Sequence, residues 1–210
     1  MIKQASIVVT ALTAIGVGTG FAATLSIGSN HLWAGTQTLT KSTCTVTAAT
    51  DTYVDESKAT ASNGSSTTMS VQPDSRKRRY SLISFDLSGC NLPTTAGADA
   101  ATLKLVVTSA PSASRTMTVT PITSAWSGST TWNTQPTYAA AATRTVASGT
   151  TNGATISIPV TVDVDGYVKG GTNDGWRIAD LGTQASGDTT TFATTNASSN
   201  KPQLVIDDEK

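Results

Sequence analysis

From Cys44 onward, apolar and polar residues alternate in short segments along the chain. The clearest segment is RKRRYSLISFDL, residues 76–87, in which Ile83 and Phe85 fall on the same face at period two. Alternation over about four to eight residues is typical of a β-strand with one buried face. We therefore expect a strand here, with Ile83 and Phe85 pointing into a core.

Further segments with strand-like patterns follow one another, separated by turns rich in Gly, Ser, Pro and Asn. They are residues 44–48, 51–57, 68–71, 101–110, 115–123, 143–149, 155–164, 176–183, 190–195 and 201–208. Only residues 162–171, VDVDGYVKGG, could hold a helical turn instead. The pattern predicts an all-β fold, an antiparallel, jelly-roll-like β-sandwich that forms a single domain over residues 44–210.

The composition agrees with this prediction. Thr, Ser, Ala and Gly dominate, while glutamate is confined to Glu56 and Glu209, which disfavours long helices and suits β-branched strands. The formal net charge is +0 and only 13% of the residues are charged. No global field therefore attracts nucleic acid or an anionic membrane, and any electrostatic recognition must be local.

Residues 1–22 predict a signal peptide, because one early lysine precedes an apolar run and then small residues. Gly20 and Ala22 suit signal peptidase, which places cleavage after Ala22. The alternative is a retained membrane anchor, although the glycines and threonines make a poor spanning helix. Residues 23–43 form a polar lead-in segment, either a linker or a loose strand. The protein is expected in the extracellular space or on a bacterial cell surface.

Two cysteines are present, Cys44 and Cys90. An even pair behind an export signal favours a disulfide over two free buried thiols. Their spacing matches no metal-binding pattern such as a CxxC pair. The bridge would close a loop of about 45 residues and stabilise the fold by about 3 to 4 kcal/mol on the loop-entropy model.

Few residues are candidates for catalysis. The one histidine, His31, lies in the lead-in segment and would have to fold back onto the sandwich to form a catalytic triad or a zinc site. An acid/base pair would need aspartates such as Asp163, Asp165 or Asp174, and nothing in the sequence raises the pKa of one of them. We therefore predict that the protein is not an enzyme.

The acidic segment DVDGYVKGGTND, residues 163–174, has the chemistry of a hard-cation site, because Ca²⁺ prefers carboxylate and carbonyl oxygens. Asp163 and Asp165 are the candidate metal ligands, and Asp51 and Asp55 could join them if they lie nearby. The alternative is a set of solvated turn residues. No cofactor is required, and calcium is the one that the sequence suggests.

The basic run Arg76, Lys77, Arg78 and Arg79 is the strongest charge cluster in the chain. On a strand or its leading turn, four adjacent cations place two side chains on each face, so at least one pair should face solvent. The run could protect an edge strand by charge, or bind an anionic ligand through arginine forks. Nucleic acid is disfavoured because no further basic stripe or stacking aromatics accompany the run.

The motif STTWNTQP, residues 129–136, places Trp132 between two threonines and a turn. Such a ring could form a platform for sugars or an anchor that locks a loop onto the core. We favour the anchor, at the end of a strand. Trp126, Trp176 and Tyr138 are the aromatic residues with more chance of exposure.

Several of these segments together resemble a known family. DTYVDES, KRRYSLISFDL, AWSGSTTWNTQP and KPQLVI are similar, in order, to the DNRLRE domain, a family of secreted β-sandwich modules that overlaps carbohydrate-binding module family 96. The resemblance covers about residues 48–207. It implies an accessory domain that binds acidic polysaccharides such as alginate, and it assigns that contact to Lys77, Arg78, Arg79 and Asn133.

The N-terminal stretch GVGTGFAATLSIGSNHLWAGTQTL also looks like the export signal of biofilm-fibre subunits of the TasA and camelysin type. In such subunits a freed N-terminal strand can complete a neighbour's sheet. Two hypotheses about the function therefore follow from the sequence. One is a non-catalytic module that binds an anionic polysaccharide, and the other is a structural subunit that assembles with like subunits through residues 23–43.

Overall fold

The structure is a computed structural model and describes residues 22–23, 37–38, 40–74, 76–92, 97–182 and 188–209. It divides into two compact units, Met1–Thr40 and Lys41–Lys210. In the first unit, β1 (Ala22–Ala23) pairs antiparallel with β2 (Gln37–Thr38). The predicted signal peptide and most of the lead-in segment, including His31, lie outside the described residues.

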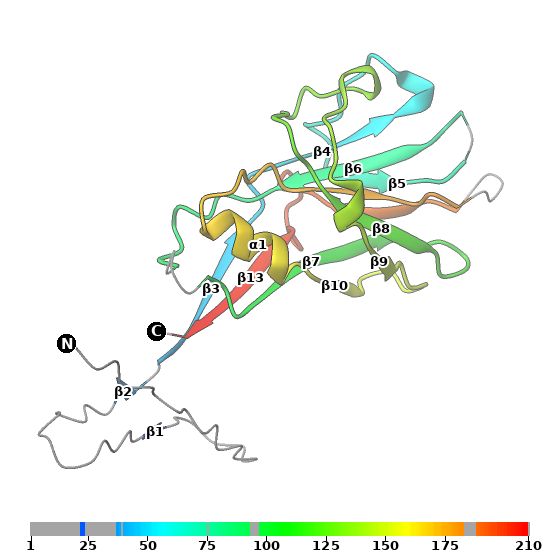
Figure 1. Cartoon of the computed structure of the whole chain (residues 1–210). Helices are drawn as coiled ribbons and strands as arrows, with labels where there is room; N and C mark the ends of the chain where they lie inside the picture. Colours follow the sequence, from blue (N-terminus) through cyan, green and yellow to red (C-terminus); the bar gives the residue numbers. More distant parts are fainter. Residues whose placement is uncertain are drawn as a thin grey trace, which may run out of the picture. The chain divides into compact units, whose positions relative to one another are not determined.

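The second unit consists of two antiparallel sheets (Figure 1). The six-stranded sheet contains β3 (Lys41–Thr47), β13 (Gln203–Glu209), β7 (Ala100–Ser109), β12 (Thr190–Ala193), β5 (Thr68–Val71) and β10 (Thr155–Pro159). The five-stranded sheet contains β4 (Thr50–Asp55), β6 (Arg79–Ser84), β11 (Trp176–Ala179), β8 (Thr116–Pro121) and β9 (Arg144–Ala147). The predicted all-β sandwich is confirmed.

The helical elements are short: α1 (Thr161–Val168) and the 3-10 turns η1 (Glu56–Lys58), η2 (Trp132–Thr134) and η3 (Ala140–Ala142). The strand expected over 155–164 ends at Pro159, and α1 follows in the segment where a helical turn was expected. Helix α1 buries Asp163 and Val164. No helix of the described residues is long and apolar enough to cross a membrane.

The main core lies between the sheets and contains Ile83, which is fully buried, and Phe85, which is 3% exposed. Both residues point inward as predicted. The opposite face of β6 is buried as well, because Tyr80 and Leu82 belong to a second apolar cluster. This second cluster explains why β6 shows buried residues on both faces rather than a simple alternation.

The second cluster lies under the segment 122–138, from which Ile122 is buried and Trp126, Trp132 and Tyr138 pack against it. The expectation that Trp176 is exposed is wrong, since its side chain is fully buried in the main core. An indole can be buried without penalty only where its N–H finds an acceptor, and here Asp163 supplies one. Trp126 and Tyr138 are half-buried.

The predicted disulfide between Cys44 and Cys90 is present, with a Cα–Cα distance of 5.8 Å. Cys44 lies in β3, which forms one edge of the six-stranded sheet and, among the described strands, pairs only with β13. Cys90 belongs to the segment that follows β6, and its side chain packs into the main core. The bridge therefore fixes an edge strand to the interior of the sandwich.

We predict that the double variant Cys44→Ser, Cys90→Ser loses about 4 kcal/mol of its free energy of unfolding, because the bridge spans 46 residues and restricts the unfolded chain. Guanidinium denaturation followed by tryptophan fluorescence measures the loss. Wild-type protein unfolded with reductant should match the variant. Equal midpoints for oxidised wild type and variant would contradict the prediction.

Candidate functional site

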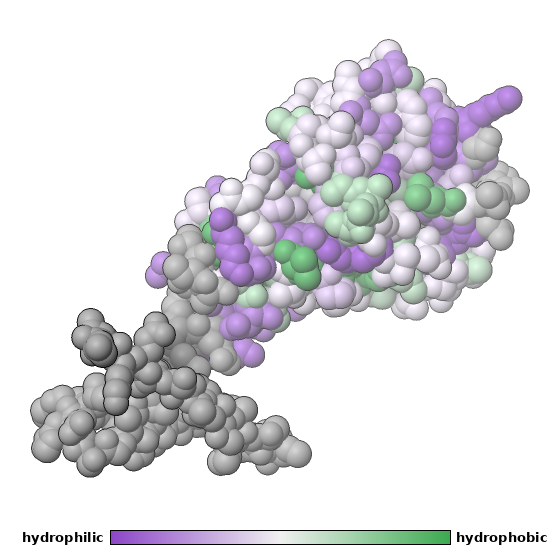
Figure 2. All heavy atoms as spheres, in the orientation of Figure 1, coloured by the Kyte–Doolittle hydropathy of each residue, from purple (hydrophilic) through white to green (hydrophobic). Residues whose placement is uncertain are grey.

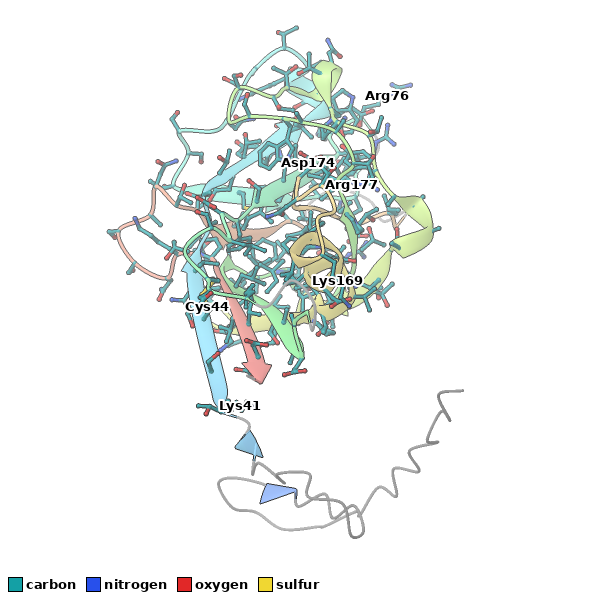
Figure 3. All side chains as sticks on the ribbon, turned by 60° about the vertical axis from the view of Figure 1, so that its left-hand side comes forward. Lys41, Cys44, Arg76, Lys169, Asp174 and Arg177 are labelled. Atoms are coloured by element: carbon teal, nitrogen blue, oxygen red, sulfur yellow. A yellow bond between two sulfur atoms is a disulfide. The ribbon has the colours of Figure 1, made fainter. Side chains whose placement is uncertain are left out.

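The basic run lies in the turn between β5 and β6, with Arg79 as the first residue of β6. Gln72 and Arg79 exchange backbone hydrogen bonds of 3.1 and 3.0 Å and close the turn, and Arg76 adopts a positive φ of 69° at its tip. Arg76, Lys77 and Arg78 are exposed. Figure 3 shows Arg76 at the periphery of the sandwich. The turn thus presents three of the four predicted cations to solvent.

Two residues of the run are held by carboxylates at the end of β4 and the start of η1. Arg78 makes a two-pronged ion pair with Glu56, with Nε–Oε2 and Nη2–Oε1 distances of 2.9 and 2.6 Å. Arg79 pairs with the buried Asp55 at 2.9 Å from Nε to Oδ2. These contacts fix the two guanidinium groups in place, so that the uncompensated charge of the run is concentrated on Arg76 and Lys77.

The pKa values follow from these contacts. The hydrogen bond from Arg78 lowers the pKa of Glu56 and raises that of Arg78. Burial acts to raise the pKa of Asp55, but hydrogen bonds from Ser57 and the charge of Arg79 outweigh it and lower the pKa overall. Both carboxylates are therefore charged at neutral pH, and the ion pairs are intact there.

A continuous stack of rings and guanidinium groups extends from this run across the outer side of the five-stranded sheet. Cζ of Arg78 lies 5.3 Å from the centre of the Trp132 ring, and Trp132 lies 5.0 Å from Tyr80. Arg177 follows, with Cζ 5.1 Å from the centre of the Tyr80 ring and 4.0 Å from that of Tyr138. We call Arg78, Trp132, Tyr80, Arg177 and Tyr138 the aromatic-arginine stack.

Local hydrogen bonds hold the outer members of the stack. Gln135 donates to the Trp132 carbonyl at 3.0 Å and accepts from the Tyr138 hydroxyl at 2.9 Å. Thr131 and Thr134 cap η2 reciprocally. The segment is thus held in its conformation by its own hydrogen bonds.

Asn133 is exposed, and its backbone N–H donates to the carbonyl of Ala59 at 3.2 Å. This bond ties η2 to the end of η1, beside the carboxylate that holds Arg78. Trp132 lies in η2 rather than at the end of a strand, where it was expected. Its partly exposed ring packs on the second cluster and also supports Arg78. The structure therefore brings Arg78 and Trp132 into contact and places Asn133 next to them.

Arg177 was not among the predicted site residues. Its signal in the sequence is the tetrapeptide WRIA of β11: once Trp176 and Ile178 face the core, Arg177 must face the other side. Burial acts to raise the pKa of the neighbouring Tyr138 to about 12, although the charge of Arg177 acts to lower it. Tyr138 is therefore a neutral phenol at physiological pH.

The candidate metal ligands are occupied by protein cations and donors. Asp163 accepts hydrogen bonds from both Nη groups of Arg144 and from the Trp176 indole at 2.6 Å. Asp165 pairs with Lys169 at 2.9 Å, one helical turn away. Within the described ranges, no group of three histidine, cysteine, aspartate or glutamate residues could hold a metal ion. Asp163 thus has a structural role between α1, β9 and β11.

Asp163→Ala should lower the free energy of unfolding by about 3 kcal/mol, because it leaves the Arg144 charge and the Trp176 N–H without a partner. Asp163→Asn, which keeps an acceptor for the indole, should lose less. Asp165→Ala is a matched control on the same helix, since its exposed i,i+4 pair contributes about 0.3–0.5 kcal/mol. Urea denaturation measures all three. A calcium-dependent rise in wild-type stability that Asp163→Ala abolishes would contradict this role.

Comparison with known proteins is consistent with this architecture. The family model for carbohydrate-binding module family 96 matches residues 42–208, which cover both sheets and the aromatic-arginine stack. A search of curated proteins gave no match.

Proposed function

Because the chain belongs to carbohydrate-binding module family 96, we propose that this module binds an anionic polysaccharide, a polyuronate such as alginate, at the turn between β5 and β6. The contact is made by Arg76, Lys77, Arg78 and Arg79, with Asn133 beside them. It requires no catalysis and no bound cofactor. The disulfide and the family are both typical of extracellular proteins, where such polymers occur.

The observation that carries the proposal is the pair Arg76 and Lys77. Both side chains are exposed, and neither forms an ion pair with a carboxylate of the described residues. The chain as a whole is formally neutral. An unbalanced local charge on a neutral protein attracts anions to that place and not to the surface in general.

The surroundings suit a polar ligand. Figure 2 shows only small, separate hydrophobic patches on the visible face of the sandwich. Val162 and Leu181 are the large exposed apolar residues of the described chain. An apolar ligand or a broad apolar partner surface would need a larger contiguous patch. Arg78 lies over the Trp132 ring and pairs with Glu56 through Nε and Nη2, so Nη1 is the nitrogen outside this ion pair that a ligand carboxylate can contact.

We predict that the double variant Arg76→Gln, Lys77→Gln binds alginate about fivefold more weakly than wild type at low salt, because two exposed ion pairs of about 0.5 kcal/mol each are lost. Isothermal titration calorimetry measures the dissociation constants. Raising the salt concentration should weaken wild-type binding more than it weakens binding by the variant.

The matched control is Lys104→Gln, Lys201→Gln, which removes the same charge from β7 and from the residue two places before β13. This control should bind alginate with the affinity of wild type. None of the three proteins should bind a neutral glucan. Equal weakening by both double variants would show only a general effect of net charge. Absence of wild-type binding to any acidic polysaccharide at millimolar concentration would refute the proposal.

A second function, assembly with like subunits into an extracellular fibre or adhesin on the cell surface, is favoured by one observation. Strand β3 begins within the lead-in segment, at Lys41, and among the described strands it pairs only with β13. One edge of the six-stranded sheet is therefore open to a strand from a neighbour.

Removal of residues 23–40 from the exported protein distinguishes assembly from glycan binding. If the lead-in segment is donated to a neighbour, size-exclusion chromatography and electron microscopy should show assemblies for the longer protein and monomers for the shorter one. Alginate affinity should not change, because the basic turn lies in the second unit. Monomers from both proteins would exclude assembly through this segment.

A further inference from the structure

Arg177 differs from the other arginines that the structure describes. Four of them pair with carboxylates: Arg78 with Glu56, Arg79 with Asp55, Arg115 with Asp180 and Arg144 with Asp163. Arg76 has no such partner among the described residues but is exposed at the tip of its turn. Arg177 is half-buried, and no carboxylate of the described residues lies within ion-pairing distance of it.

This arrangement leaves a positive charge partly removed from water without an ion-paired carboxylate among the described residues. Its Nε is buried and has no hydrogen-bond acceptor among the described residues. Tyr138, the nearest ring, is neutral at physiological pH and supplies no negative charge. Partly buried cations are normally paired, since the cost of desolvation is otherwise not offset.

The position of Arg177 is nevertheless fixed. Its neighbour Trp176 is fully buried and bonded to Asp163, and the guanidinium lies between the rings of Tyr80 and Tyr138. When the faces of a guanidinium contact aromatic rings, its edge, which carries the N–H donors, remains available to other groups. A planar acceptor with two oxygens matches that edge.

We propose that Arg177 binds a carboxylate of the same acidic polysaccharide and forms a second anion contact beyond the basic turn. This inference rests on the proposed function and extends it to a specificity-determining residue. Arg177 is linked to Arg78 through Tyr80 and Trp132, so that both guanidinium groups belong to the aromatic-arginine stack. A polymer with a carboxylate on successive sugars can meet both, whereas a single sugar acid can meet only one.

The nature of the neighbours favours a sugar chain over an acidic peptide. Trp132 and Tyr138 are partly exposed rings next to the two guanidinium groups, and the apolar face of a sugar ring packs well on such a surface. The family of the chain is a carbohydrate-binding one. Binding of poly-glutamate as tightly as of a polyuronate would overturn the choice of ligand.

The test compares Arg177→Gln and Arg177→Lys with wild type in the full chain, with oligogalacturonates of increasing length as probes. Arg177→Gln should bind long oligomers at least tenfold more weakly, as expected when a charged hydrogen bond of about 1.4 kcal/mol or more is lost. Arg177→Lys, which keeps the charge but not the fork, should fall between the two. For wild type, the Arg177 Nε–H signal in the ¹⁵N spectrum should shift on titration.

The outcomes separate this inference from the proposed function. If wild type binds long oligomers and Arg177→Gln binds them equally well, Arg177 is not a contact, while the role of the basic turn stands. If wild type binds no acidic oligomer and the Nε–H signal does not move, both are wrong. Thermal unfolding of each variant shows whether the fold is retained. A Nε–H signal that stays fixed during wild-type binding would also overturn the inference, even if Arg177→Gln fails to fold.

Discussion

The hydrogen bond from the Trp176 indole to Asp163 is the interaction on which much of the remaining structure depends. It joins a strand of the five-stranded sheet to α1, and the Arg144 ion pair extends the link to β9. Around it, Phe85 and Tyr167 contact the indole ring. The bond allows the large Trp176 side chain, with its polar N–H, to fill the core, and the Arg144 guanidinium pairs with the same Asp163 carboxylate.

The same bond decides what lies on the opposite side of the sheet. Successive residues of a strand face opposite ways, and a slip of one residue would exchange them. With Trp176 fixed inside, Arg177 must lie outside, between Tyr80 and Tyr138. The interior and the aromatic-arginine stack are therefore two consequences of one register. A substitution in the core at Asp163 can affect the outer surface without touching it.

The fold was predictable to a large extent because period-two patterns and turn residues report local geometry directly. Ile83 and Phe85 point inward as the pattern indicated, and the cysteine pair forms its bridge. The burial of Trp176 was missed, because its acceptor Asp163 comes from another element and only the folded chain brings them together. For the same reason the sequence revealed the basic run but did not reveal Glu56 and Asp55 as its partners. These carboxylates pair with Arg78 and Arg79.

The disulfide has a mechanical consequence. Strands β3 and β13 are antiparallel, with Lys41 opposite Glu209. The first residue of β3 and the last residue of β13 therefore lie at the same end of the sandwich. Figure 3 shows Lys41 and Arg76 at opposite ends of the sandwich. Force between a bound polymer at Arg76 and a tether before Lys41 would act along β3 and load its hydrogen bonds with β13 together, in shear. If they yield, β3 can be drawn out only as far as Cys44, where the covalent bond to Cys90 takes over the load.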